Sequence, residues 1–145
     1  MNPKIEELTS ANDAKGLTEM LWSNDVQDHP TALQNIEEAV RALEKVDDPS
    51  AVDGLIDFLG RRSEFMEKLI NRYIDLWSDR PYMTADQAKD SALAKYQTVQ
   101  FSAIRIFEKF GGERAAGYLR RMADSDPDSD VRNDADNAWQ CLQEK

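Results

Sequence analysis

Apolar residues recur at spacings of three and four along nearly the whole chain, and no segment alternates strictly between apolar and polar residues over the length of a strand. The first pattern places apolar side chains on one face of a helix, whereas alternation would place them on one face of a sheet. Thr31 and Gln34 have the spacing of a capping box, so one helix is expected to begin near Thr31, to run through Leu43 and to be ended by Asp47, Asp48 and Pro49. The sequence therefore predicts an all-α protein.

The ends of the following helices are expected at polar and glycine positions. Ser50 begins a second helix, and Gly60 is expected to end it in the left-handed conformation. Ser63 is expected to cap a third helix that ends near Ser78. Thr84 lies three residues before Gln87, the spacing of a second capping box, and predicts a long helix. This helix is expected to end at Gly111-Gly112 and to be followed by helices over about 113–123 and 128–142.

Two of the predicted helices end in similar sequences. Residues 39–46 read AVRALEKV and residues 103–110 read AIRIFEKF, so small, apolar and charged side chains recur in the same order. Ala138 and Leu142 repeat part of this pattern. Segments that recur along a helical chain in this way are typical of stacked helical hairpins. Ala39 and Ala103 are then expected at crossings where a small side chain lets two helices approach closely.

The turn at Asp126-Pro127 and the apolar residues of the following helix resemble the second half of a HEAT repeat, as do Asp48-Pro49 and the helix after them. The resemblance implies a right-handed α-solenoid of about three HEAT-like hairpins, each packed against its neighbours. The segment over about 63–90 interrupts the repeat and is interpreted as an inserted helix and loop within a single domain of residues 1–145. Arrays of this family mostly bind partners on an extended surface.

Acidic side chains outnumber basic ones, and the net charge is −10. Residues 1–60 carry 13 acidic and 4 basic side chains, whereas residues 61–123 carry 8 acidic and 12 basic ones. Nucleic-acid binding is driven by basic side chains that replace counterions, so a nucleic-acid partner is not expected. The N-terminal residues form neither a secretory signal nor a membrane span, and a cytoplasmic location is expected.

Residues with catalytic or metal-binding chemistry are few. The one cysteine, Cys141, has the spacing of a core or boundary position, and the one histidine, His29, precedes a proline in a polar segment. The acidic run 124–130 resembles the start of a calcium loop, but it has Ser129 where such a loop needs glycine, and Ala135 where it needs a bidentate glutamate. We therefore interpret these acids as helix caps and expect no enzyme activity, cofactor or metal.

Two groups of residues are candidates for partner binding. Glu37, Glu38 and Arg41 lie on one predicted helix, although Arg41 and its repeat equivalent Arg105 suit a salt-bridge ladder equally well. The second group is the segment after the inserted helix, because tryptophan, tyrosine and arginine are enriched at binding hot spots. Its members are Trp77, Arg80, Tyr82 and Met83.

The expected function is a non-enzymatic protein-binding module, such as a scaffold, adaptor or inhibitor, whose acidic surface attracts a basic partner. Two alternatives remain open at this point. The chain could be a HEAT-like enzyme or enzyme subunit resembling the bilin lyases, or an immunity protein that neutralises a toxin. The expected oligomeric state is a monomer or a weak homodimer.

Overall fold

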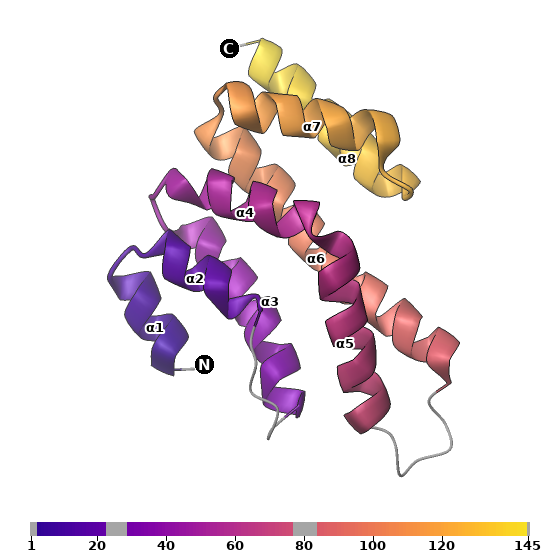
Figure 1. Ribbon diagram of the computed structural model, residues 1–145. Helices are drawn as coiled ribbons and strands as arrows, with labels where there is room; N and C mark the ends of the chain where they lie inside the picture. Colours follow the sequence, from indigo (N-terminus) through magenta and orange to yellow (C-terminus); the bar gives the residue numbers. More distant parts are fainter. Residues whose placement is uncertain (1–2, 23–28, 77–83, 145) are drawn as a thin grey trace.

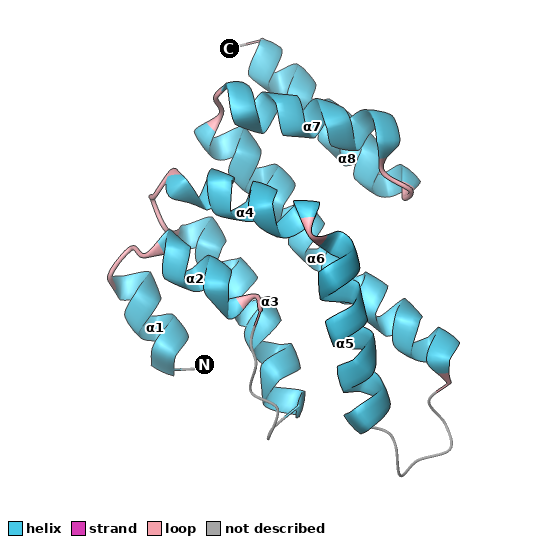
Figure 2. Cartoon of the chain, in the orientation of Figure 1, coloured by secondary structure: helices cyan, strands magenta, loops and turns pink. Residues whose placement is uncertain are grey.

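The computed structural model describes residues 3–22, 29–76 and 84–144, without the side chains at positions 29–35, 72, 73, 75, 76 and 85. The described residues form helices joined by short connections, with no strand among them (Figure 2). The fold class is all-α, as predicted. The helices are α1 (Pro3–Ser10), α2 (Ala14–Met20), α3 (His29–Lys45), α4 (Ser50–Gly60), α5 (Arg62–Leu76), α6 (Ala85–Phe110), α7 (Glu113–Ser125) and α8 (Ser129–Gln143).

Six of the helices form two rows (Figure 1). In one row α4 packs between α2 and α7, and in the other α6 packs between α3 and α8. The rows contact each other where α2 meets α3, where α4 meets α6 and where α7 meets α8. At the N-terminal end α1 packs on α2 and α3, and α5 lies along α6. The repeated segments predicted from the sequence thus occupy the same row, in α3, α6 and α8.

Side-chain caps begin three of the helices. The Asp13 carboxylate accepts a hydrogen bond from the Gly16 backbone N–H at 3.0 Å at the start of α2. Thr84 and Gln87 form the predicted capping box of α6, with distances of 3.1 and 2.9 Å. Asp128 accepts from the Val131 N–H at 3.0 Å and caps α8. Each cap satisfies a backbone donor that the first turn of a helix leaves unpaired.

Three predicted helix boundaries were wrong. Gly60 belongs to α4 and does not have a positive φ. The chain leaves α4 at Arg61 (φ −107°, ψ 36°), a conformation that does not need glycine, and α5 begins at Arg62 before the predicted cap at Ser63. Helix α3 begins at His29, so Thr31 lies within it. Positive φ occurs instead at Gly111 and Gly112 (67° and 93°), where α6 ends as predicted.

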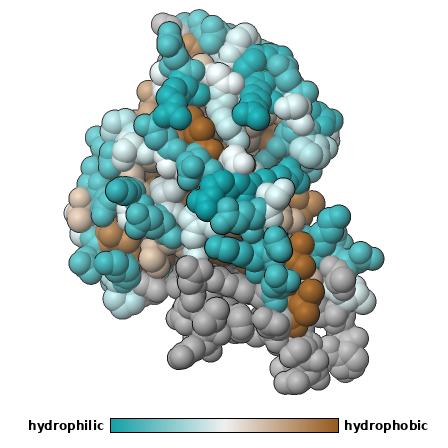
Figure 3. Space-filling view, viewed as in Figure 1, coloured by the Kyte–Doolittle hydropathy of each residue, from teal (hydrophilic) through white to brown (hydrophobic). Residues whose placement is uncertain are grey.

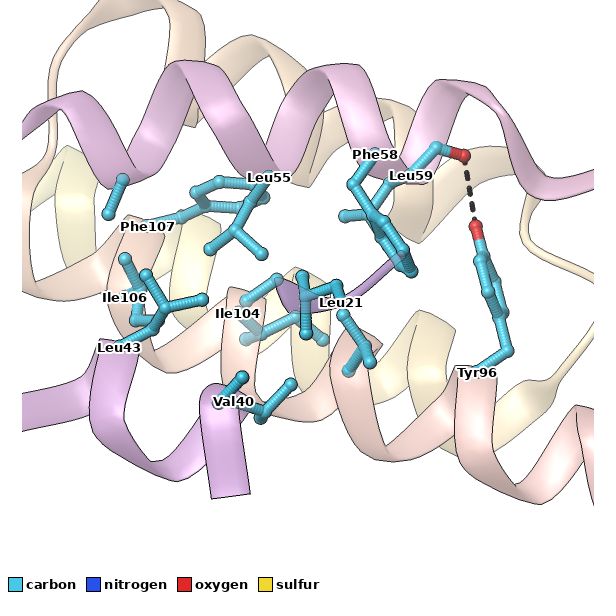
Figure 4. Packing of buried hydrophobic residues seen from close by; sticks show 14 of the residues in the cluster. Leu21, Val40, Leu43, Leu55, Phe58, Leu59, Tyr96, Ile104, Ile106 and Phe107 are labelled. Carbon is cyan, nitrogen blue, oxygen red and sulfur yellow. Dashed lines mark hydrogen bonds between the residues drawn. The ribbon is translucent and has the colours of Figure 1, made fainter. Parts of the chain in front are cut away.

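The buried core runs between the two rows (Figure 4). Ala39 in α3 and Ala103 in α6 are both fully buried, and α3 packs on α6, as the repeat predicted. In Figure 4, Leu43 of α3 lies near Ile106 of α6 and below Leu55 of α4. Small residues therefore let α3 and α6 approach closely while larger neighbours fill the space between the rows.

Helix α5, the predicted insertion, buries apolar side chains in its first two turns. Phe65 and Leu69 are buried, whereas Met66 and Ile70 are partly buried against the core. Ile74 is 41% exposed, more than any other large apolar side chain in the described part of the chain. Figure 3 shows apolar atoms at the surface beside the atoms drawn grey. The first two turns of the insertion thus fill space next to α6.

Candidate functional site

A groove with a volume of about 480 Å³ lies between α2 and α4. Its apolar part comes from Trp22 and from the small residues Thr18 and Gly54. Its charged residues come from both helices and from Arg61, which connects α4 to α5. The residues that line it are Lys15, Thr18, Glu19, Trp22, Ser50, Asp53, Gly54, Asp57 and Arg61.

Small residues bring α2 and α4 together at the floor of the groove. Thr18 is buried, and its hydroxyl donates to the Ala14 carbonyl oxygen at 2.8 Å. A Cβ atom at position 54 would lie 2.8 Å from the Thr18 Oγ1 atom, closer than real Cβ atoms come to a neighbour. Glycine at position 54 therefore sets the depth of the groove, because any larger residue would push the two helices apart.

Trp22 forms the apolar wall and is fixed by other aromatic rings. Its ring centroid lies 5.0 Å from that of Phe58 and 5.9 Å from that of Phe65, in tilted and edge-on arrangements. The Arg61 guanidinium lies 4.5 Å from the Trp22 ring centroid. Aromatic pairs and cation–π contacts of this kind hold a ring in one orientation. The groove thus has a preformed wall on which an aliphatic stem can lie.

Carboxylates line the rim of the groove. Glu19, Asp53 and Asp57 are exposed, and Asp53 forms an ion pair with Arg114 of α7. Both side chains of that pair are more than half exposed, so the pair contributes little to stability and can exchange partners. Arg61 is held by the Glu64 carboxylate through two hydrogen bonds of 2.8 and 2.9 Å. Asp57 also forms an exposed ion pair with Arg61 at 3.8 Å, so an incoming cation would compete with basic side chains of the chain for two of the three carboxylates.

The predicted partner-binding residues lie away from this groove. Glu37 and Glu38 of α3 are partly buried, and Glu37 forms an ion pair with Lys95 of α6. Arg41 is exposed on α3. These three residues do not line the groove between α2 and α4. The second predicted group, Trp77, Arg80, Tyr82 and Met83, lies outside the described residues.

Arg105, the repeat equivalent of Arg41, forms the contact expected of a salt-bridge ladder. The Arg105 guanidinium of α6 donates to the Glu44 carboxylate of α3, and Ser102 donates to the same carboxylate at 3.2 Å. The hydrogen bond from Arg105 lowers the pKa of Glu44 below its usual value, against the opposing effect of burial. Arg105 therefore links α6 to α3, which agrees with the salt-bridge interpretation of its position.

Residues that carry nucleophilic or metal-binding chemistry do not converge. Cys141 is exposed, so its prediction as a core or boundary residue was wrong: it lies in the last turn of α8, beyond Ala138, the last buried residue of that helix. Within the described ranges, no group of three or more His, Cys, Asp or Glu side chains is arranged to hold a metal ion.

In the acidic run, Asp128 caps α8, and Asp124 forms an ion pair with Arg120. Asp126 accepts hydrogen bonds from Gln100 and from the Asp128 backbone N–H. Asp124, Asp126 and Asp128, three of the four carboxylates of this run, are therefore engaged in contacts within the chain.

Sequence reasoning missed the groove because its residues are spread over two helices that are distant in the chain. Trp22 follows Leu21 at the end of an amphipathic segment, where it reads as an ordinary core residue. Gly54 lies in the middle of a helix, where glycine costs stability and is a signal of close packing. That signal could have indicated a helix crossing, but it does not identify Thr18 as the residue on the other side.

Comparisons of the chain with protein-family models, with curated proteins and with solved structures find no match. In the part of the chain that the structure describes, no helix combines the length and the apolar character needed to cross a membrane.

Proposed function

We propose that this chain is a protein-binding module that takes a basic segment of its partner in the groove between α2 and α4. One observation carries the proposal: an apolar groove with a fixed tryptophan wall is bordered by Glu19, Asp53 and Asp57 in the most acidic part of the chain. A lysine or arginine side chain has the matching chemistry, because its stem is apolar and its end is cationic.

The charge distribution supports a basic partner. Residues 1–60 form α1 to α4 and carry 13 acidic against 4 basic side chains. A surface of one sign raises the association rate of a partner of the opposite sign. Lys15 and Arg61 are the basic residues that line the groove, and Arg61 is already paired with Glu64. An incoming cation therefore meets net negative charge.

The arrangement of the helices supports the proposed HEAT-like architecture. Segments 39–46 and 103–110 have similar sequences and lie in α3 and α6, which are neighbours in one row. The helices that follow them, α4 and α7, are neighbours in the other row. We propose a short right-handed α-solenoid with α5 inserted between α4 and α6. Helices stacked in this way hold a groove between neighbours in a constant shape.

Selection from a displayed library of random peptides tests the proposal. The full chain should enrich peptides in which lysine or arginine lies next to an apolar residue. The double variant Glu19→Gln, Asp57→Asn should bind a selected peptide about three- to tenfold more weakly, since each exposed ion pair contributes up to about 1 kcal/mol. Binding should also weaken with added salt.

The matched control is Glu6→Gln, Glu7→Gln, which removes the same charge from exposed positions of α1. This variant should retain nearly full binding. Peptides without a basic bias, or equal losses in both double variants, would show that the groove between α2 and α4 is not the binding site.

A further inference from the structure

A second cavity, of about 190 Å³, lies where the end of α4 meets α6 and the end of α7. Two arginines and two tyrosines line it: Arg62 and Tyr96, and Arg121 and Tyr118. The Arg62 guanidinium lies 5.0 Å from the Tyr96 ring centroid, and that of Arg121 lies 5.9 Å from the Tyr118 ring centroid. The tyrosine rings thus hold both cationic groups at the same cavity.

In the described part of the chain, neither guanidinium group forms an ion pair. Arg61, Arg105, Arg114 and Arg120 each form an ion pair with a carboxylate. Among the described residues, no ion pair joins Arg62 or Arg121 to a carboxylate, although the chain has many more acidic than basic side chains. A pair of cations with open hydrogen-bond donors is therefore present in an otherwise acidic protein.

The other polar groups of the cavity are already bonded. The Tyr96 hydroxyl donates to the Leu59 carbonyl oxygen at 3.0 Å, a contact visible in Figure 4. Gln100 donates to one carboxylate oxygen of Asp126 at 2.6 Å, and the Asp128 N–H donates to the other at 3.0 Å. The Asp126 carboxylate is held in these contacts and does not pair with either guanidinium, although its charge opposes an anion nearby.

The arginines and Tyr118 supply hydrogen-bond donors at the cavity. Both guanidinium groups offer N–H donors, and the Tyr118 hydroxyl has no hydrogen-bond partner within the described ranges. Burial raises the pKa of Tyr118, so its hydroxyl keeps its proton at neutral pH and is able to donate. A planar guanidinium matches the oxygen atoms of carboxylates and phosphates, which it binds through two parallel hydrogen bonds.

We propose that this cavity binds an oxyanion, a carboxylate or phosphate group carried by a small molecule, between Arg62, Arg121 and Tyr118. The size of the cavity supports a single anionic group, because pockets for larger organic ligands occupy roughly 300 to 1,000 Å³. The site is separate from the groove between α2 and α4 and does not depend on the proposed function.

Inorganic phosphate and glutarate, titrated separately into the full chain, test this site. Calorimetry gives the dissociation constant, and NMR follows the Nε–H signals of the arginines. At least one of the two anions should bind with a constant on the order of 1 mM and shift the signals of Arg62 and Arg121. Phosphate alone would identify a phosphate site, glutarate alone a carboxylate site, and both a general oxyanion site.

Variants locate the site. Arg121→Gln and Arg62→Gln should each weaken binding at least tenfold, and Tyr118→Phe should weaken it about three- to tenfold, as expected for loss of one hydrogen bond to a charged group. Arg121 is exposed, so its variant keeps the test valid if Arg62→Gln does not fold. Arg41→Gln removes an equal charge from α3 and should bind normally.

The proposal is overturned if neither anion shifts these signals, or if Arg41→Gln weakens binding as much as Arg121→Gln does.

Discussion

Gly54 and Gly117 are both helical glycines, but their surroundings differ. A Cβ at position 54 would meet Thr18 at 2.8 Å, whereas a Cβ at position 117 would have no neighbour within 4 Å. Thr18 is buried and hydrogen-bonded to α2, so it cannot easily move aside. The same substitution should therefore have opposite effects at the two positions.

Gly54→Ala should lower the free energy of unfolding by about 1 to 3 kcal/mol, because overpacking outweighs the roughly 0.5 to 1 kcal/mol that alanine adds in a helix. Gly117→Ala should raise it by about 0.5 to 1 kcal/mol. Urea denaturation measures both values. An increase for Gly54→Ala would mean that α2 and α4 are not in close contact at Thr18.

Ala103 is fully buried in α6, on the helix that packs against α3. Ala103→Leu should destabilise the protein by about 1 to 3 kcal/mol, since the added side chain has no space at this position. Ala94→Leu, at an exposed position of the same helix, should change stability by less than about 0.5 kcal/mol. Thermal or urea unfolding compares the two variants, and equal effects would contradict the close approach of α3 and α6.

The sequence predicted the surroundings of some residues but not the backbone conformation of others. Ala39 and Ala103 were predicted as crossing residues because a repeated pattern supports each of them. Gly60 and Gly111 both follow apolar helical segments, yet only Gly111 has a positive φ. The direction in which the next helix leaves determines the conformation of each glycine, and that direction depends on packing that the sequence does not display.

Glu44 and Arg105 link α3 to α6 through a hydrogen-bonded ion pair. The pKa of Glu44 is lowered in the folded protein, chiefly by the hydrogen bond from Arg105. A carboxyl group with a lowered folded pKa stabilises the protein above its unfolded pKa, near 4.3, and loses this contribution as the pH falls through the folded pKa. The pair therefore contributes stability at neutral pH that is lost in acid.

Glu44→Gln should lower the free energy of unfolding at pH 7 by about 0.5 to 1 kcal/mol and should reduce its loss between about pH 5 and pH 3. The magnitude is small because the Arg105 side chain is 58% exposed to solvent. Urea unfolding across this pH range measures the effect. In a double-mutant cycle, Arg105→Gln should add little to Glu44→Gln; full additivity would mean that the two groups do not interact.

The ends of the elements show which local signals are reliable. The capping box at Thr84 and the aspartate cap at Asp128 were predicted correctly, because both depend on hydrogen bonds within one turn. Helix α5 was predicted as an insertion, but its start was placed at Ser63 instead of Arg62. How much of α5 would be covered depends on how it packs on α6, and this could not be derived from periodicity.

The helices form rows in which each one packs mainly on its neighbours. In such arrays, stability is approximately a sum over units and their interfaces. Leu17 of α2 and Leu119 of α7 are fully buried at opposite ends of one row. A destabilising substitution at one end of the row should therefore have little effect on local stability at the other end.

Leu17→Ala should lower hydrogen-exchange protection of α1 to α3 by about 2 to 5 kcal/mol and leave α7 and α8 nearly unchanged. Leu119→Ala should have the reverse effect. Exchange measured by mass spectrometry distinguishes the two ends. A uniform loss of protection along the chain in both variants would indicate a single cooperative unit instead of a linear array.

The all-α class and the recurrence of helices within one row followed from spacing and internal similarity. The positions of the groove between α2 and α4 and of the second cavity did not follow from these sequence patterns. Trp22 and Asp57 line the groove between α2 and α4, and Arg62 of α5 and Arg121 of α7 line the second cavity. Each pair joins residues far apart in the chain, so only the packing of the rows brings them together.

The insertion of α5 also affects the order in which contacts form during synthesis. Contacts between the two halves join residues far apart in sequence: Tyr96 to Leu59, Lys109 to Val46 and Arg105 to Glu44. The apolar face of α3 that packs on α6 has no partner until α6 leaves the ribosome. At about 5 to 20 residues per second, the intervening segment keeps that face exposed for seconds. The nascent chain therefore presents a transient binding site for chaperones.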